Sequence, residues 1–386
     1  MIPVFASSLS KLLGLWCSTV NSLLQLEMGA CCCSRSGKLE DLTPIWYNDF
    51  LKELPSMEGK RVAITGATSG TGFVAACACV KKGAEIILLN RPSERAEEAE
   101  RKIREEFPGA IVHSIPCDLS DFTSVRAVKH EFLKIFQSGY FGGVPQLDIL
   151  CCNAGIMLHP DKATKDGFDV QMQTNHLSHF LLVKDFFPAL EAAAAAKGEA
   201  RIVNHTAFAR HGSPLDEKYL RQNGGELGGD TLKACGERYH HTKLANIVFT
   251  YALDARLKAR GSKVKAVCAS PGFAATSLFS NVEAGGTDLG AMKCFLYTFG
   301  PLTMQSSADG TMPMLLCMAG DGIESGDLIT PSESLWWRTP PEAWGLPSIF
   351  KRPLPYPEKS YVCEDEQAQS VLWKESQKAI GESFEI

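Results

Sequence analysis

The chain has 386 residues, which suits a single α/β domain with added terminal segments as well as it suits two domains. Hydrophobic residues make up 45% of it and charged residues 22%, which excludes bulk disorder and predicts a large buried core. Its net charge of −5 provides no basic field for a phosphate backbone, so we expect no general nucleic-acid binding.

The fourteen cysteines are scattered or adjacent, and the sequence contains no CxxC pair. This spacing differs from that of a small disulfide framework. Several cysteines lie in apolar stretches, where a free cysteine acts as a small hydrophobic residue. We therefore expect a reducing compartment.

Residues 1–56 are predicted to form an extension ahead of the folded domain. Residues 1–27 are Leu-rich but interrupted by Ser, Thr and Asn, so they fit neither a secretory signal nor a spanning helix. Residues 28–34, Met-Gly-Ala-Cys-Cys-Cys-Ser, resemble a doubly acylated amino terminus, which would matter only if translation began at Met28. A disordered or amphipathic leader, a membrane-surface anchor and organelle targeting stay open as alternatives. The predicted location is the cytoplasm or the cytosolic side of a membrane, with an organelle as the alternative.

From Gly59 onward, short apolar runs alternate with amphipathic helical stretches, the pattern of a parallel sheet wrapped by helices. Strands are predicted at 61–64, 85–89, 110–113, 147–152, 201–205, 263–269 and 328–329. Helices are predicted from the first strand to about Lys82, at 93–106 with Ser93 as cap, after a Ser120 cap, at 169–196 with an interruption near Pro188, at 239–260 and at 371–379. We predict one three-layer, doubly wound α/β domain over 57–386, with a mainly parallel sheet of about seven strands.

Residues 273–361 differ from the rest because helical periodicity is broken there by prolines. This segment contains many large apolar side chains, namely Phe279, Phe295, Tyr297, Phe299, Met304, Met312, Trp336, Trp337 and Trp344. An apolar substrate lobe over the active site and a plain packing layer are both open interpretations.

A glycine-rich turn follows the first strand and precedes the first helix of the domain. It consists of Thr65, Gly66, Ala67, Thr68, Ser69, Gly70, Thr71 and Gly72. Glycine lets the backbone turn tightly and approach a pyrophosphate above a helix amino terminus. In this strand-turn-helix context the turn predicts a Rossmann fold that binds a dinucleotide, against the alternative of an ordinary glycine-rich turn.

The end of the second strand distinguishes the two nicotinamide cofactors. A carboxylate there accepts hydrogen bonds from a ribose 2′-hydroxyl but repels a 2′-phosphate. This chain has Asn90 and Arg91, which supply no acid and one guanidinium suited to a phosphate. We therefore predict NADP(H), the alternative being that Arg91 is only a solvated surface residue.

Tyr239 and Lys243 lie four residues apart, so one helix face can present both side chains. An ammonium about 4 Å from a phenol contributes on the order of 4 kcal/mol, or about three pKa units, toward phenol ionisation. Tyr239 would then act as general acid in carbonyl reduction or as base in alcohol oxidation. Lys243 would also hold the nicotinamide ribose.

The TGxxxGxG spacing and the run Tyr-His-His-Thr-Lys-Leu-Ala-Asn at 239–246 resemble the short-chain dehydrogenase/reductase family, in its retinol dehydrogenase and protochlorophyllide reductase-like branch. The resemblance covers about 59–282 and, loosely, the terminal helix. It implies a relay role for Asn175 and a nicotinamide-side loop at Pro271, Gly272 and Thr276. It further implies cofactor contacts from Asp118, Leu119, Asn153, Ala154 and Gly155.

One position departs from this pattern. The family reads RIVNVSS where this chain reads RIVNHTA at 201–207, so the serine that hydrogen-bonds the substrate oxygen becomes Ala207. Thr206 is the nearest hydroxyl, but successive strand residues face opposite sides. Loss of such a donor costs about 10²–10³ in rate, so a slow enzyme and an NADP(H)-bound sensor or scaffold with little turnover are both open.

We predict an NADP(H)-dependent oxidoreductase that transfers a hydride between nicotinamide and a carbonyl, an alcohol or an activated C=C of an apolar small molecule. A homo-oligomer and attachment of the extension to a membrane surface are further expectations. His176 and His179 are three residues apart, but no Cys or carboxylate set completes a metal site, so we expect no metal. We interpret His205, His240 and His241 as local hydrogen-bonding residues.

Overall fold

A single twisted sheet forms the centre of the computed structural model, which describes residues 42–136, 144–276, 304–331 and 365–386 and positions 278, 282, 289 and 351–352. Within this part of the chain the strand order is β3-β2-β1-β4-β5-β6-β7-β8, with β1 to β7 parallel and β8 antiparallel to β7. The strands are β1 (Arg61–Thr65), β2 (Glu85–Asn90), β3 (Val112–Pro116), β4 (Ile149–Cys152), β5 (Ala200–His205), β6 (Val264–Ala269), β7 (Leu328–Ile329) and β8 (Lys351–Arg352). The predicted doubly wound fold and mainly parallel sheet are confirmed.

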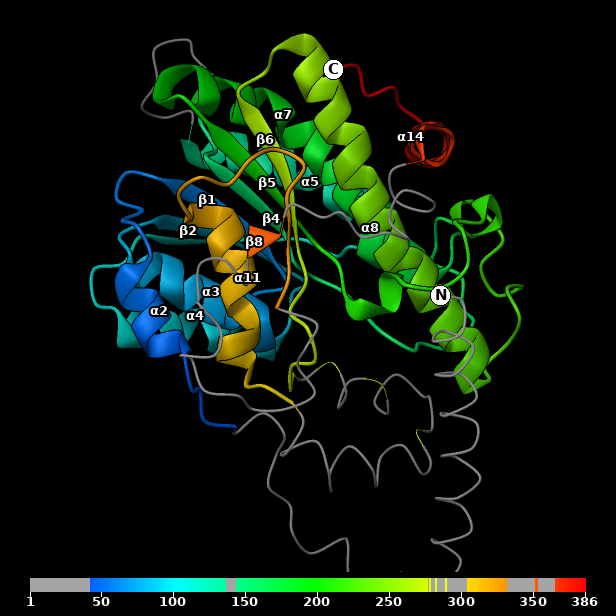
Figure 1. Ribbon diagram of the computed structural model, residues 1–386, viewed down its shortest axis with the longest axis horizontal. Helices are drawn as coiled ribbons and strands as arrows, with labels where there is room; N and C mark the ends of the chain where they lie inside the picture. The colour runs from blue at the N-terminus through cyan, green and yellow to red at the C-terminus, as the bar shows by residue number, and fades with distance from the viewer. Residues whose placement is uncertain are drawn as a thin grey trace, which may run out of the picture.

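Helices cover both faces of the sheet (Figure 1). One face carries α2 (Tyr47–Glu53), α3 (Gly70–Lys81), α4 (Glu94–Glu106) and α11 (Ser307–Ala319). The other carries α5 (Phe122–Phe136), α7 (Ser178–Lys197) and α8 (Leu232–Arg260), with α14 (Glu366–Ile380) against α8. Strand side chains alternate between these layers: Val62 and Ile64 pack toward α3, and Ala63 packs toward α7.

The interruption predicted near Pro188 lies elsewhere. Asp169 caps the short helix α6 (Val170–Met172), a π-helical segment follows at Gln173–Leu177, and α7 continues through Pro188. Phe186 and Leu190 are buried on either side of this proline, so packing against the sheet keeps the helix continuous. The irregular turn instead contains Asn175, and π-helical turns of this kind occur often at functional sites.

Two helix starts also differ from prediction. α8 begins at Leu232, where the Thr231 side chain accepts the N–H of Ala234, so Tyr239 lies two turns inside the helix. α5 begins at Phe122 and is capped by Asp121, whose carboxylate accepts the N–H of Thr123 at 2.7 Å. Ser120 donates its hydroxyl to Asp118 instead of capping. The cap predicted at Ser93 is confirmed, since its hydroxyl accepts the N–H of Ala96.

Part of the predicted amino-terminal extension belongs to the folded core. Leu51 and Leu54 are buried with the α3 and α11 side chains. The carboxylate of Asp309 on α11 accepts the N–H groups of Ile45, Trp46 and Tyr47 at 2.9–3.0 Å, which caps α2 from a distant part of the sequence. The leader and the Cys-rich motif at 28–34 lie outside the described residues.

The segment expected to form an apolar lobe, 273–361, is not uniform. Residues 307–329 contribute α11 and β7 to the central fold, and Met312 is buried in the core against α3. Other described residues of this segment, Ala275, Val282, Leu289 and Met304, form a small apolar cluster of their own. The aromatic residues named above for this lobe lie outside the described part of the chain.

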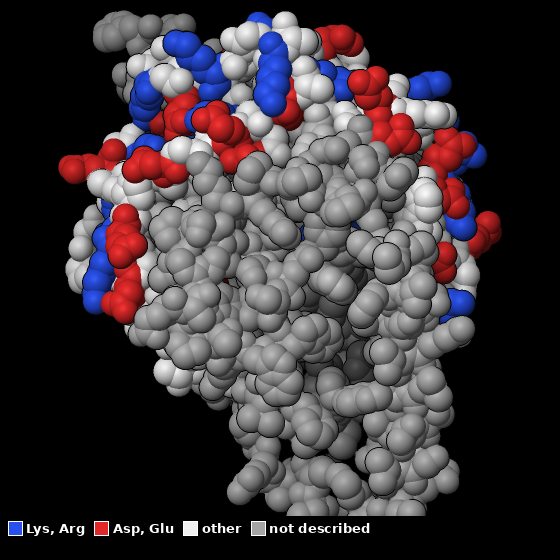
Figure 2. All heavy atoms as spheres, in the orientation of Figure 1, with Lys and Arg blue, Asp and Glu red and all other residues white. Residues whose placement is uncertain are grey.

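Charges of both signs lie side by side on the described surface in Figure 2. On α4, Arg101 pairs with Glu98 and Glu105, and Arg104 pairs with Glu100. In the described part of the chain, no helix combines the length and apolar character needed to cross a membrane.

Candidate active site

The glycine-rich turn lies at the carboxyl edge of the sheet, next to the point where the non-consecutive strands β1 and β4 pair. Gly66 and Gly70 have φ of +69° and +55°, which favour glycine. A Cβ at Gly66 would lie 2.8 Å from the Cα of Ala154, and a Cβ at Gly72 would lie 2.4 Å from the carbonyl oxygen of Gly66. The turn therefore has the close-packed backbone that a pyrophosphate site requires, at the place where doubly wound folds bind nucleotides.

Residues predicted to contact the cofactor also brace this turn. Asn90, at the end of β2, accepts the N–H of Ala67 on its side-chain oxygen at 2.8 Å. Asn153 donates its amide to the carbonyl oxygen of Thr65 at 2.9 Å and accepts the hydroxyl of Thr71 at 3.0 Å. Strands β1, β2 and β4 are thus tied together through the turn that follows β1.

Two arginine guanidinium groups follow the end of β2. Arg91 is exposed directly after the strand. Arg95, from the first turn of α4, donates to the hydroxyl of Ser69 in the glycine turn. Sequence reasoning identified Arg91 but missed Arg95, which lies in the first turn of the helix that follows β2.

The loops after β3 and β6 lie at the same edge of the sheet as the glycine turn. Asp118 accepts the N–H and the hydroxyl of Ser120, while Leu119 is buried and its carbonyl oxygen accepts the hydroxyl of Ser178 at 2.6 Å. After β6, a Cβ added to Gly70 would lie 3.4 Å from the Cβ of Thr276. The loop predicted on the nicotinamide side therefore contacts the glycine turn.

Pro271 and Gly272 form the bend between β6 and Thr276. Gly272 has φ of +67°, and a Cβ there would lie 3.0 Å from the side chains of Gln305 and Pro331. Gln305 donates its side-chain amide to the carbonyl oxygen of Pro271. This bend directs the chain from β6 back toward the glycine turn.

Tyr239 and Lys243 are both buried on α8. Lys243 Nζ lies 5.8 Å from the centre of the Tyr239 ring and donates to the carbonyl oxygen of His205, the last residue of β5, at 3.1 Å. A Cβ added to Gly155 would lie 3.4 Å from the same nitrogen. The structure thus brings the helix, the end of β5 and the Asn153-Ala154-Gly155 element together.

Burial controls the protonation of this pair. It raises the pKa of the Tyr239 phenol and lowers the pKa of Lys243 to about 8. From the sequence, we expected a charged Lys243 to lower the pKa of the Tyr239 phenol. In the structure the pKa of the phenol is raised instead, because desolvation disfavours the charged form of both groups.

Asn175 connects to the tyrosine through one intermediate residue. Its amide nitrogen donates to the hydroxyl of Thr242, which donates to the carbonyl oxygen of Tyr239, at 2.9 and 2.8 Å. Its side-chain oxygen accepts the N–H of Ile156 at 2.8 Å. The π-helical turn places Asn175 between α8 and the loop after β4.

Thr206 does not replace the missing serine in this structure. Its buried hydroxyl donates to the carbonyl oxygen of Lys243 at 2.6 Å, so it faces the backbone of α8. The physical reason is strand alternation: residues 205 and 207 face the other side of β5. Ala207 has an extended backbone at the end of this strand, with φ −151° and ψ 170°.

From the sequence, we considered His179 only as a possible metal ligand. Its ring contacts the hydroxyl of Thr65 at 2.9 Å and the carbonyl oxygen of Asn175 at 3.0 Å, linking the glycine turn to the relay. His240 contacts the carbonyl oxygens of Ala209 and Ser213. In the parts of the chain that the structure describes, no group of His, Cys, Asp and Glu side chains is arranged to hold a metal ion.

Known proteins share this sequence pattern and arrangement. A family model for short chain dehydrogenases matches residues 60–214. Retinol dehydrogenase 12 from Bos taurus is 31% identical over 280 residues, which cover 72% of this chain and 79% of that protein. Polyprenol dehydrogenase from Mus musculus is 28% identical over 328 residues, covering 85% and 86%. The chain belongs to the short-chain dehydrogenase/reductase family, and its relatives place it in the retinol dehydrogenase-like branch.

Solved structures share the fold. An uncharacterized protein from Mycobacterium paratuberculosis superposes with a TM-score of 0.60 at 25% identity, covering 87% of this chain and 98% of that one. The 3-ketoacyl-(acyl-carrier-protein) reductase of Brucella melitensis, complexed with NADH, gives a TM-score of 0.51 at 23% identity, with 71% and 97% covered. As a member of the short-chain dehydrogenase/reductase family, the protein is an NAD(P)-dependent oxidoreductase with a nicotinamide cofactor.

Proposed function

We propose that the protein reduces a carbonyl group, or an activated C=C, of an apolar small molecule with NADPH. The observation that carries the proposal is the pairing of a buried phenol, Tyr239, with a buried amine, Lys243, beside a glycine turn. Because burial raises the pKa of Tyr239, the phenol holds its proton near neutral pH. A protonated phenol suits the general acid that carbonyl reduction requires.

Preference for NADPH is supported by the charges beside the turn. Arg91 and Arg95 supply guanidinium groups at the end of β2, and Asn90 stands where an acid would repel a 2′-phosphate. Bound at this turn, the cofactor would supply the hydride. Lys243 and the Asn153-Ala154-Gly155 element would hold its nicotinamide ribose, and Tyr239 would deliver the proton to the substrate oxygen.

An apolar substrate is supported by apolar side chains in the loops that follow β4, β5 and β6. Met157, Leu158 and Leu232 pack with Ala275 and Met304 in a small apolar cluster beside the loop after β6. Phe208 and Phe273, adjacent to Ala207 and Gly272, are 64% and 48% exposed. Two relatives carry the names retinol dehydrogenase and polyprenol dehydrogenase, and both names describe apolar alcohols.

The proposal is tested by NADPH oxidation with a panel of medium-chain aldehydes, ketones and retinoids. Tyr239→Phe should remove at least ~99% of the turnover while the dissociation constant for NADPH stays near that of the wild type. Equal turnover in the variant would reject the assignment of Tyr239 as general acid.

A second candidate function, an NADP(H)-bound sensor or scaffold, is motivated by Ala207. Thr206, the hydroxyl residue next to Ala207, donates to the carbonyl oxygen of Lys243 and so faces α8. NADPH binding without turnover on the whole panel, together with no gain from Ala207→Ser, would favour this alternative.

A further inference from the structure

Leu158 has a strained backbone beside the proposed substrate site. Its φ is +51°, and it is the one non-glycine residue with positive φ among those the structure describes. A left-handed conformation costs a leucine about 1–2 kcal/mol. Strain of this kind persists only where the surroundings hold it, and it clusters at functional sites.

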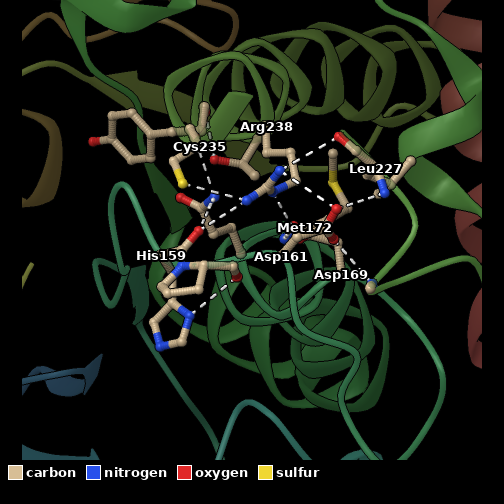
Figure 3. A network of polar contacts seen from close by, with 12 residues as sticks. His159, Asp161, Asp169, Met172, Leu227, Cys235 and Arg238 are labelled. Carbon is tan, nitrogen blue, oxygen red and sulfur yellow. Dashed lines mark hydrogen bonds and ion pairs between the residues drawn. The ribbon is translucent and has the colours of Figure 1, made fainter. Parts of the chain in front are cut away.

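A fully buried arginine holds the carbonyl group of His159, the residue after Leu158 (Figure 3). The carbonyl oxygen of His159 accepts hydrogen bonds from Arg238 Nη2 at 3.1 Å and from Gln171 Nε2 at 3.4 Å. Arg238 directly precedes Tyr239 on α8. Its Nη1 also donates to the carbonyl oxygen of Gly229 at 2.9 Å, so one side chain joins the loop after β4 to the loop before α8.

Two buried carboxylates hold this guanidinium in place. Asp169 Oδ2 lies 3.4 Å from Nε, and Asp161 Oδ2 lies 3.7 Å from Nη1. Asp161 also accepts the N–H groups of Gly225, Leu227 and Gly229 at 2.6–2.9 Å. The charges are thus paired inside the protein, and they fix both loops relative to α8.

The side chain of Leu158 lies against α8, close to the helical turn that leads to Tyr239. Its Cδ2 lies 3.5 Å from the position that a Cβ on Gly236 would occupy, and Gly236 is one helical turn before Tyr239. Leu158 also packs with the apolar cluster of Ala275 and Met304. The side chain therefore lies beside α8, about one helical turn before Tyr239, and against the apolar cluster that includes Ala275 of the loop after β6.

We propose that Leu158 is a specificity-determining residue that contacts the apolar part of the substrate, and that Arg238 is the positioning residue that keeps it there. This inference rests on the proposed function, because it assumes an apolar carbonyl substrate at Tyr239. Without the Arg238 contact, the loop relaxes from the left-handed conformation and Leu158 leaves the substrate side.

Leu158→Gly tests the proposed role of Leu158, because glycine accepts φ of +51° and the variant removes only the side chain. With NADPH, we expect the KM for decanal to rise about tenfold while kcat and the KM for butanal change less than about threefold. Glu237→Gln, an exposed neighbour of Arg238, is the matched control and should behave as the wild type. An unchanged ratio of kcat/KM for decanal and butanal would overturn the role of Leu158.

Arg238→Met and Arg238→Lys test whether Arg238 positions Leu158. The methionine variant should raise the KM for decanal as Leu158→Gly does, and hydrogen exchange at residues 157–162 should accelerate about tenfold or more. The lysine variant keeps a buried cation and should restore part of the decanal preference. If exchange accelerates in Arg238→Met but chain-length preference stays at the wild-type value, Arg238 stabilises the loop without positioning Leu158.

Binding without turnover separates this inference from the proposed function. Decanal is titrated calorimetrically into protein saturated with NADP⁺, a mixture that cannot reduce the aldehyde. Weaker binding to Leu158→Gly than to the wild type supports the contact even if the wild type turns over no carbonyl. Equal binding to both proteins overturns the contact, whatever the activity.

Discussion

The hydroxyl of Thr206 donates a 2.6 Å hydrogen bond to the main-chain carbonyl of Lys243. In the reverse direction, Lys243 Nζ donates to the carbonyl oxygen of His205. The end of β5 and the middle of α8 are therefore locked together at the proposed site. Because the Thr206 hydroxyl faces α8, Ala207, two residues after β5, is the position from which a hydroxyl could reach the substrate side.

Ala207→Ser should increase turnover. A serine hydroxyl there adds a hydrogen-bond donor to the developing oxyanion, which is worth about 10²–10³ in rate elsewhere, so we expect kcat to rise at least about tenfold. Steady-state NADPH oxidation with the best aldehyde of the panel measures it. Thr206→Val is the control: it removes a hydroxyl bonded to α8, so it should lower stability without any gain in kcat.

Arg91→Ala should weaken NADPH binding selectively. A charged hydrogen bond contributes about 1.5–3 kcal/mol, so the dissociation constant for NADPH should rise about tenfold or more while that for NADH changes little. Fluorescence titration of the reduced cofactors measures both constants. Arg101→Ala, on a later turn of α4, is the control. A parallel loss for NADH would mean that Arg91 does not contact a 2′-phosphate.

Asp169→Asn should change how stability depends on pH. Burial raises the pKa of Asp169 to about 6, even beside Arg238, which also faces Asp161. The folded protein thus holds a proton that the unfolded chain releases between pH 3.8 and about 6, and this contribution to stability is lost as pH rises through 6.

Asparagine keeps the helix cap but has no titratable proton, so the free energy of unfolding of the variant should lack the decrease that the wild type shows as pH rises from 4.5 to 8. Urea unfolding at several pH values measures the free energy of unfolding of both proteins. An equal decrease in the two proteins would show that Asp169 does not cause it.

Asp309→Ala should destabilise the whole fold. The carboxylate is buried and accepts three backbone N–H groups from residues 45–47, which lose their partner in the variant. We expect a loss of about 2–4 kcal/mol in the free energy of unfolding. Urea unfolding measures it, and Asp49→Ala, an exposed change on α2, should have little effect. Equal stabilities would imply that residues 45–47 contribute nothing to folding.

Local patterns were sufficient to predict much of the site. The glycine turn depends on φ values and close backbone approaches within a few residues, and Tyr239 and Lys243 share a helix face by spacing alone. The mainly parallel sheet likewise follows from the alternation of apolar runs with helices, whereas the order of its strands comes from the structure. These features depend on short-range geometry, which the sequence encodes directly.

Contacts between distant residues decided the rest. Arg238 meets Asp161 and Asp169, Asp309 caps a helix 262 residues earlier, and α7 continues through Pro188 because both of its flanks are buried. The sequence does not show which residue a charged side chain will pair with. It also does not show whether the residues beside a proline will be buried, because burial is a property of the packed molecule. The sequence by itself determined the fold class and the cofactor turn. Only the tertiary structure decided which side Thr206 faces and how Leu158 is held, because both depend on hydrogen bonds between segments that fold together.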